Sequence, residues 1–300
     1  MHWASDQPSR KEFPVFGRLC LTLAGLGLAA CAPGLNREGA NREGILGHEE
    51  VLDHEAVLNQ GEGIVHGRRA LKKESTSESV VALVTEGETG QALCTAVLVA
   101  EDFVLTAAHC VENNPRRMAI AFATHLRGVK SEKLRWADVA QQHERWHESN
   151  RGGLGDLALI HFTGGLVEGY EVADLAPPST SLVAGTAVRL LGYGVTNGLR
   201  RKGSGTLRET DTQVIQKVTP TEIATDGQTS SVCFGDSGGP AFVQSADGWL
   251  VWGIASSVTN RACNELSIHT NLASYHGWIK STMARLRKKA KDNGYDDAGN

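Results

Sequence analysis

Short apolar runs separated by turn-forming residues are the feature that most limits the folds open to this chain. Glycine, aspartate and asparagine lie between the runs, and each run is short for a helix. The chain holds 34 glycines but only 8 prolines, which favours many turns over a disordered linker. This pattern predicts an all-β domain, either a barrel or a sandwich. The runs cover residues 80–84, 96–99, 103–106, 156–162, 188–191 and 250–255.

The C-terminal part of the chain has a helical pattern instead. Apolar residues at helical spacing over residues 273–286 predict an amphipathic helix that closes the folded domain. We expect that domain to span residues 64–287 and the charged residues 288–300 to form a frayed tail. The composition is 41% hydrophobic, which suffices for a core, and the net charge of −4 argues against nucleic acid as a partner.

The N-terminus has the pattern of an export signal. Arg10, Lys11 and Arg18 precede twelve apolar residues at 19–30. Twelve residues are too few to span a bilayer, which needs ~20, but they fit the apolar part of a signal peptide. We therefore interpret residues 1–30 as a signal peptide, with a buried core helix as the less favoured alternative.

The end of this apolar run resembles the lipobox of bacterial lipoproteins. Residues 28–31 read Leu-Ala-Ala-Cys, and the resemblance implies a lipid group on Cys31 that would attach the protein to a membrane. The alternative is ordinary cleavage and secretion. Residues 31–63 are polar and rich in glycine, which predicts a tether or propeptide. We expect an exported protein, either a lipoprotein of the bacterial cell envelope or a secreted one.

The cysteines support export. Cys20 leaves with the signal peptide and Cys31 is assigned to lipid, so four remain for disulfides. Four cysteines allow three pairings, and an exported protein keeps disulfides that the cytosol would reduce. The four are Cys94, Cys110, Cys233 and Cys263.

Ser237 lies in the glycine-rich string Gly-Asp-Ser-Gly-Gly-Pro at 235–240. Glycines permit a tight turn, so the N–H groups of Gly235 and Ser237 can approach a substrate and hold an oxyanion. The string also fits the nucleophile elbow of α/β-hydrolases, which would mean a lipase or esterase. In that class the acid and the histidine follow the serine, whereas the best candidates here precede Ser237.

A general base and an acid stand upstream of this serine. His109 lies in Thr-Ala-Ala-His-Cys at 106–110, and an imidazole can take a hydroxyl proton near neutral pH. Asp156 opens the apolar run 156–162, where a buried acid needs a partner such as a histidine N–H. Alone, Asp156 would be read as a turn residue, but together the motifs predict a Ser-His-Asp triad.

These motifs, in the order His, Asp, Ser, resemble the trypsin/chymotrypsin family of serine peptidases. The likeness extends from residue 64 to about residue 278, and Gly-Tyr-Gly at 192–194 resembles the Gly-Trp-Gly segment of that family. The resemblance implies two six-stranded antiparallel β-barrels with a C-terminal helix and the active site between the barrels. It also implies a serine endopeptidase that cuts protein or peptide substrates through an acyl-enzyme.

The resemblance assigns a role to each motif residue. His109 would be the general base, Asp156 would orient it, Ser237 would attack, and Gly235 with Ser237 would donate to the oxyanion. It implies the disulfides Cys94–Cys110 and Cys233–Cys263, each worth ~2–4 kcal/mol. Val188 and Val243 stand where another bridge of the family would be.

The resemblance also implies activation by cleavage. Ile-Val-His-Gly at 64–67 resembles the N-terminus that family members expose, and the freed amine of Ile64 would pair with Asp236. Gly63 precedes Ile64 where the family usually has Arg or Lys, so a trypsin-like activator is not expected. The alternative is that residues 64–67 form only the first strand and are never cut.

Four residues match the specificity pocket of the family. Ser231 replaces the acid of trypsin-like members, and Val258 stands where open pockets have glycine. Ser256 matches the residue that bonds the substrate backbone, and Ser267 lines the opposite wall. This set predicts a preference for small or medium apolar side chains before the scissile bond (P1).

We expect a monomer with no metal and no cofactor. The histidines are scattered, with no HExxH and no CxxC motif. A catalytically silent relative that only binds is a second hypothesis, but the complete triad and the oxyanion glycines argue against it.

Overall fold

The computed structural model describes residues 64–71, 76–87, 90–111, 117–147 and 154–294. The predicted signal peptide at 1–30, Cys31 and the tether at 31–63 lie outside these residues. Within the described part of the chain, no helix is both long and apolar enough to cross a membrane.

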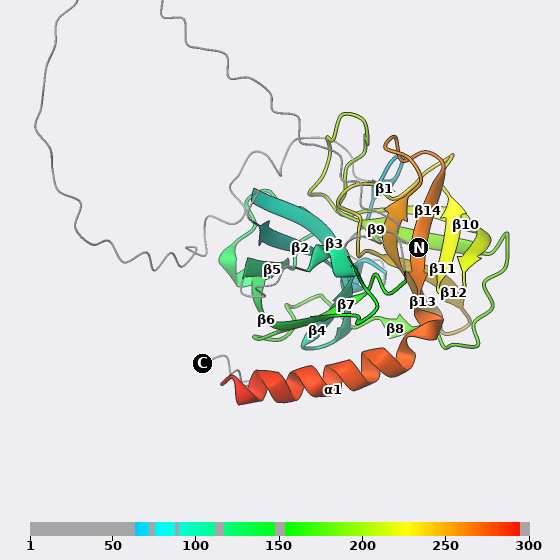
Figure 1. The fold of residues 1–300 in the computed structure, drawn as a ribbon. Coiled ribbons are helices and arrows are strands. Elements are labelled where there is room, and N and C mark those ends of the chain that lie inside the picture. The colour runs from blue at the N-terminus through cyan, green and yellow to red at the C-terminus, as the bar shows by residue number, and fades with distance from the viewer. Residues whose placement is uncertain (1–63, 72–75, 88–89, 112–116, 148–153, 295–300) are drawn as a thin grey trace, which may run out of the picture. The chain divides into compact units, whose positions relative to one another are not determined.

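The first half of the domain is a closed barrel of six antiparallel strands (Figure 1). The strands pair in the order β2-β3-β4-β7-β6-β5. All residues of β4 and β7 are buried, and these two strands lie next to the segments that bear His109 and Asp156. The strands are β2 (Val80–Gly87), β3 (Gly90–Ala100), β4 (Phe103–Thr106), β5 (Met118–Ala121), β6 (Leu134–Gln142) and β7 (Ala158–Phe162).

The second half is also a six-stranded antiparallel barrel. It closes because β9 pairs with both β10 and β12. Two short strands lie outside this ring: β1 (Arg68–Arg69) pairs with β10, and β8 (Asp174–Leu175) pairs in parallel with β13. The barrel strands are β9 (Ala187–Gly192), β10 (Arg208–Thr219), β11 (Glu222–Asp226), β12 (Pro240–Ser245), β13 (Gly248–Val258) and β14 (Leu266–Asn271). The prediction of two six-stranded barrels is confirmed.

The C-terminal helix is longer than its apolar pattern indicates. We expected it to cover residues 273–286, but a 3-10 turn (Leu272–Ser274) comes first and α1 runs over His276–Asp292. The predicted tail from residue 288 therefore begins inside the helix. Ala290 continues the buried face, and basic residues in the last turn suit the negative end of the helix dipole. The helix packs against β6 and β7 (Figure 1).

Two valines fill the position of the missing bridge. Val188 on β9 and Val243 on β12 are both buried in one apolar cluster of the second barrel, and their strands pair with each other. Both side chains contribute to the apolar packing of this barrel.

Candidate active site

His109 lies on a 3-10 turn (Ala108–Cys110) that directly follows β4. Ala108 and Cys110 on either side are buried, whereas 25% of the His109 side chain is exposed. The disulfide Cys94–Cys110 joins this turn to β3, as expected. The turn is therefore fixed to the first barrel while the imidazole faces a cleft.

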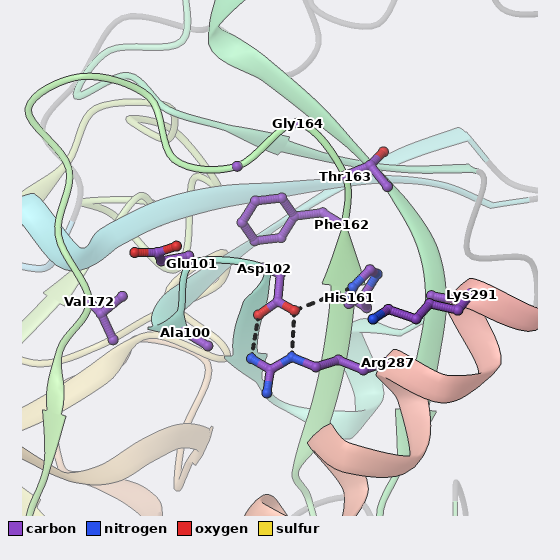
Figure 2. A pocket seen from close by; sticks show the side chains of 12 residues that line it. Ala100, Glu101, Asp102, His161, Phe162, Thr163, Gly164, Val172, Arg287 and Lys291 are labelled. Carbon is purple, nitrogen blue, oxygen red and sulfur yellow. Dashed lines mark hydrogen bonds and ion pairs between the residues drawn. The ribbon is translucent and has the colours of Figure 1, made fainter. Parts of the chain in front are cut away.

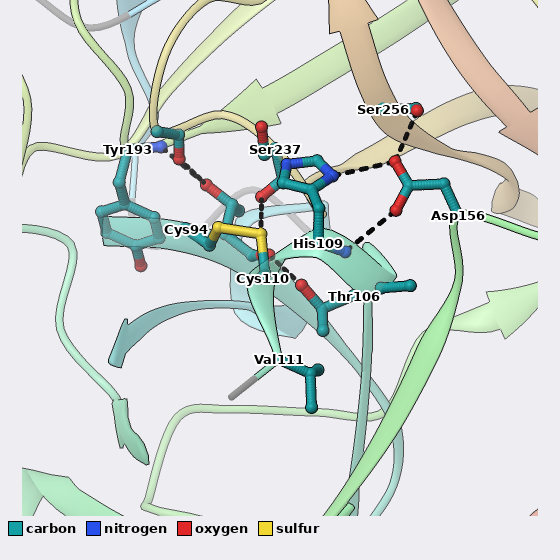
Figure 3. The surroundings of a disulfide bond; sticks show 12 residues. Cys94, Thr106, His109, Cys110, Val111, Asp156, Tyr193, Ser237 and Ser256 are labelled. Atoms are coloured by element: carbon teal, nitrogen blue, oxygen red, sulfur yellow. Dashed lines mark hydrogen bonds and ion pairs between the residues drawn. A yellow bond between two sulfur atoms is a disulfide. The ribbon is translucent and has the colours of Figure 1, made fainter. Parts of the chain in front are cut away.

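Asp156 is fully buried and lies just before β7, not inside the strand as its apolar neighbours indicated. Its Oδ1 accepts the backbone N–H of His109 at 3.1 Å, and its Oδ2 lies 2.9 Å from His109 Nδ1 (Figure 3). Since a carboxylate only accepts, Nδ1 carries the proton and the other ring nitrogen, Nε2, is free to accept one. In Figure 3 that nitrogen faces the side of Ser237.

Ser256 is a member of this arrangement that we had placed only in the specificity pocket. Its hydroxyl donates to Asp156 Oδ2 at 2.5 Å. Thr270 supports the same residue from behind, because its hydroxyl donates to the Asp156 carbonyl at 3.0 Å. Both donors come from the second barrel, so the acid is held across the barrel interface.

The loop around Ser237 passes close to the first barrel. The backbone N–H of Thr95 donates to the Ser237 carbonyl at 2.8 Å. Gly238 has a φ of +82°, and a Cβ there would lie 2.0 Å from Thr106 Oγ1 and 2.3 Å from the Thr95 carbonyl oxygen. Only glycine fits such a position, which explains the glycine after the serine.

His109 and Ser237 line one cleft of about 400 Å³ between the two barrels. Thr85, Leu93 and the Cys94–Cys110 bridge form one side, from the first barrel, and the other side comes from the second. That second set is Val232, Cys233, Phe234, Gly235, Ala255, Ser256, Ser257 and Val258. An imidazole oriented by a buried acid and a hydroxyl on a glycine-rich turn therefore line the same cleft.

The family model described as Trypsin matches residues 64–279. The chain belongs to the trypsin family. Three human relatives are similar to it: granzyme M is 30% identical over 65% of this chain and 81% of the relative. Chymotrypsin-like elastase family member 3B is 28% identical over 64% and 78%, and kallikrein-11 is 28% identical over 64% and 72%. As a member of the trypsin family, the chain is a serine-type endopeptidase.

Asp236 precedes the serine of this trypsin-family site and is fully buried. Its carboxylate accepts the N–H groups of Gly194 at 2.7 Å and Cys233 at 2.8 Å. Burial raises the pKa of Asp236 to about 7, against the opposing effect of these hydrogen bonds and of the Arg208 charge. A Cβ on Gly194 would lie 2.6 Å from the carboxylate, so the Gly-Tyr-Gly segment makes room for the acid.

The predicted pocket residues of the trypsin-family site do not all reach the cleft. Ser256 and Val258 line it, whereas Ser231 and Ser267 are buried and are not among its lining residues. The Ser231 hydroxyl lies 2.7 Å from the carbonyls of Val232 and Cys263. Ser267 pairs with Val258 across β13 and β14, and within the described residues its hydroxyl makes no hydrogen bond.

The second predicted disulfide is also present and braces the loop that bears Ser237. Cys233–Cys263 joins the segment before Ser237 to the loop between β13 and β14. The Cys94, Cys110 and His109 ligand atoms lie within 4.8 Å of one another. Because the two sulfurs are bonded to each other, they offer no thiolate to a metal.

A larger cavity of about 590 Å³ lies at the junction of the first barrel with α1 (Figure 2). Arg287 of the helix donates to both oxygens of Asp102 at 2.7 Å. His161 lies between Asp102 and Asp138, with its Nδ1 2.7 Å from Asp138 Oδ1. Burial lowers the pKa of His161, but the hydrogen bonds and charges of the two aspartates outweigh it and raise the pKa to about 9. These groups pair with one another and attach α1 to the first barrel. We therefore place the candidate active site in the smaller cleft.

Proposed function

We propose that this trypsin-family chain hydrolyses peptide bonds through Ser237, His109 and Asp156. One observation carries the proposal: the imidazole bonded to the buried acid shares a cleft with the serine. Ser237 Oγ attacks the substrate carbonyl carbon while His109 Nε2 takes the hydroxyl proton. The oxygen then carries negative charge and accepts the N–H groups of Gly235 and Ser237.

The intermediate then collapses to an acyl-enzyme. The bond between carbonyl carbon and nitrogen breaks, and His109 returns the proton to the leaving amine. In the second half of the reaction, water attacks the ester carbonyl while His109 takes a proton from it. His109 then returns this proton to Ser237 Oγ, which leaves as the acid product is released. The Asp156 carboxylate keeps the imidazole in the required tautomer and stabilises its protonated form.

A fluorophosphonate probe tests this assignment. The probe should label the wild-type chain, and Ser237→Ala should remove the label together with cleavage of casein. Ser245→Ala is a matched control, because its partly exposed hydroxyl forms hydrogen bonds with Gly248 and Asp247 in the β12–β13 turn. Labelling that persists in Ser237→Ala would show that another residue is the nucleophile.

We also propose that the chain is made as a zymogen that is cut before Ile64. The Ile64 side chain is fully buried in the second barrel, and Val65 exchanges two backbone hydrogen bonds with Ser231. The buried Asp236 carboxylate lies in the same half of the domain, where a free ammonium group would offset its burial. N-terminal sequencing of the active enzyme should begin at Ile64, whereas activity of an intact precursor would support the uncut alternative.

The proposed P1 preference is for small or medium apolar side chains. Val258 lines the cleft with its branched side chain, and Ser231 gives no charge to a basic substrate group. Peptide substrates with Ala or Val at P1 should be cut faster than those with Arg, Lys or Phe. Val258→Gly should shift the preference toward larger side chains, and an unchanged profile would contradict this role.

Export and lipidation complete the proposal. We infer a monomeric bacterial lipoprotein attached through Cys31, or its secreted form, and two disulfides support an oxidising compartment. Intact mass of the native protein should show a diacylglyceryl group on Cys31. Cys31→Ser should move the enzyme from the membrane to the soluble fraction, and membrane retention of that variant would exclude this anchor.

A further inference from the structure

Thr95 contacts the nucleophile loop with both its backbone and its side chain. It lies on β3 of the first barrel, next to Cys94, and is fully buried. Its N–H donates to the Ser237 carbonyl at 2.8 Å, and its hydroxyl donates to the Gly235 carbonyl at 2.9 Å. These are the two residues whose N–H groups would hold the oxyanion.

The direction of the Thr95 hydroxyl is fixed by its two partners. The backbone N–H of Tyr193 points to Thr95 Oγ1 at 3.1 Å, and an N–H can only donate. The hydroxyl oxygen must therefore accept from Tyr193, which leaves its hydrogen for the Gly235 carbonyl. Tyr193 is fully buried, so solvent does not compete for this N–H.

Three successive carbonyls of the loop that bears Ser237 each accept a hydrogen bond, and the Thr95 hydroxyl donates one of the three. The carbonyls of Phe234 and Asp236 accept backbone N–H groups from Val195 and Gly239, each at 2.9 Å. The carbonyl between them, on Gly235, accepts the hydroxyl of Thr95. The N–H of the middle peptide, on Asp236, donates to the Cys233 carbonyl at 3.0 Å, so this side is held within the second barrel. Its carbonyl, on Gly235, is held by a side chain of the first barrel.

The middle peptide needs such a support because glycine does not hold its own conformation. Gly235 has a φ of +97°, and a glycine backbone rotates with little steric resistance. Rotation of the peptide between Gly235 and Asp236 would carry the neighbouring N–H groups away from the substrate oxygen. Donors that are already aligned need no reorganisation during the reaction, which is the main source of their catalytic effect.

We propose that Thr95 is a positioning residue that aligns the oxyanion donors of Gly235 and Ser237 with the base on the first barrel. The inference rests on the proposed function of Ser237. Through Cys94 and its bridge to Cys110, the same strand is joined to the turn that bears His109. Donors and base are thereby held by one segment of β3.

Thr95→Val tests the proposal, because it keeps the shape of the side chain and removes only the hydroxyl. We expect kcat to fall about 10- to 100-fold with KM within about twofold, since the lost alignment matters in the transition state. Thr95→Ser keeps the hydroxyl and should retain kcat within about threefold of wild type. A peptidyl trifluoromethyl ketone, which forms a tetrahedral oxyanion adduct, should lose affinity for Thr95→Val in parallel with kcat/KM.

A matched control separates alignment from stability. Thr282 on α1 is also fully buried, and its hydroxyl accepts a hydrogen bond from Arg285 at 3.4 Å. Thr282→Val should lower the melting temperature without changing kcat. If Thr95→Val does not fold, Thr95→Ala replaces it, with the same expected loss of kcat at unchanged KM.

The outcomes divide clearly. Wild-type kcat in the folded Thr95→Val or Thr95→Ala enzyme would overturn the proposal, as would an equal loss of kcat in Thr282→Val. An equal loss of kcat in Thr95→Ser and Thr95→Val would also refute it, because serine keeps the donor. A wild-type chain without Ser237-dependent labelling would refute the proposed function itself, and the role of Thr95 would fall with it.

Discussion

The buried His161 should make the stability of the domain depend on pH in a defined direction. His161 is 5% exposed and Asp138 is 6% exposed, and the two form an ion pair at 2.7 Å. The pKa of His161 is raised from 6.5 to about 9 in the folded chain. Because the raised pKa belongs to the folded state, the added stability is complete below pH 6.5 and disappears as the pH rises through about 9.

The size of the effect follows from the shift. Each pKa unit is worth about 1.4 kcal/mol, so the His161 shift corresponds to about 3 kcal/mol of unfolding free energy. Urea unfolding at pH 6 and pH 10 measures it, in a Ser237→Ala background that prevents self-digestion. Wild type should lose about 3 kcal/mol more between these pH values than His161→Gln, which cannot carry the charge.

Other groups also titrate over this range, but they are shared by both proteins and cancel in the comparison. His161→Gln will be less stable at every pH, because it leaves Asp138 without its cation. The decisive quantity is therefore how the difference in unfolding free energy between wild type and His161→Gln changes with pH. If the difference between wild type and His161→Gln is the same at pH 6 and pH 10, the ion pair does not govern the protonation of His161.

Three further predictions concern the cleft. Gly238→Ala should abolish fluorophosphonate labelling and lower the melting temperature, because its Cβ would lie 2.0 Å from Thr106 Oγ1. Ser256→Ala removes the hydrogen bond to Asp156 and should lower kcat/KM by roughly 10-fold in a peptide assay, while unchanged kinetics would refute a role for that bond. In the uncut chain, Asp236 has a folded pKa of about 7 against an ordinary value of 3.8, so stability should fall as the pH rises from 4 to 7. Asp236→Asn should make the unfolding free energy, measured with urea, depend less on pH. Equal slopes of unfolding free energy against pH for wild type and Asp236→Asn would contradict this prediction.

The all-β class, the closing helix and the catalytic motifs could be predicted because each depends on local sequence. Apolar runs between turns indicate strands wherever they occur, and every run singled out overlaps a strand, although the run at 156–162 begins two residues before β7. The motif around Ser237 can be recognised locally, since Gly235 and Gly238 both have a positive φ that favours glycine. The pairing of the four cysteines came from the family resemblance, because spacing alone left three choices open.

Features that depend on distant partners could not be predicted. The helix continues to Asp292 because Ala290 finds a buried place against the first barrel, and the charged sequence around it gives no such signal. Asp156 lies outside β7 because Gly155, with a φ of +86°, turns the chain before the strand begins. The contacts of Thr95 with Gly235 span 140 residues, and no local pattern in β3 indicates them.

The division of the proposed reacting groups between two barrels has a consequence for biosynthesis. A ribosome delivers the imidazole and its acid long before the hydroxyl, because Ser237 lies in the later half of the chain. A chain that stops before Ser237 therefore holds the proposed base and its acid but not the proposed nucleophile. In the proposed mechanism, peptide cleavage therefore requires both barrels to be complete and packed together before the cut at Ile64 can have any effect.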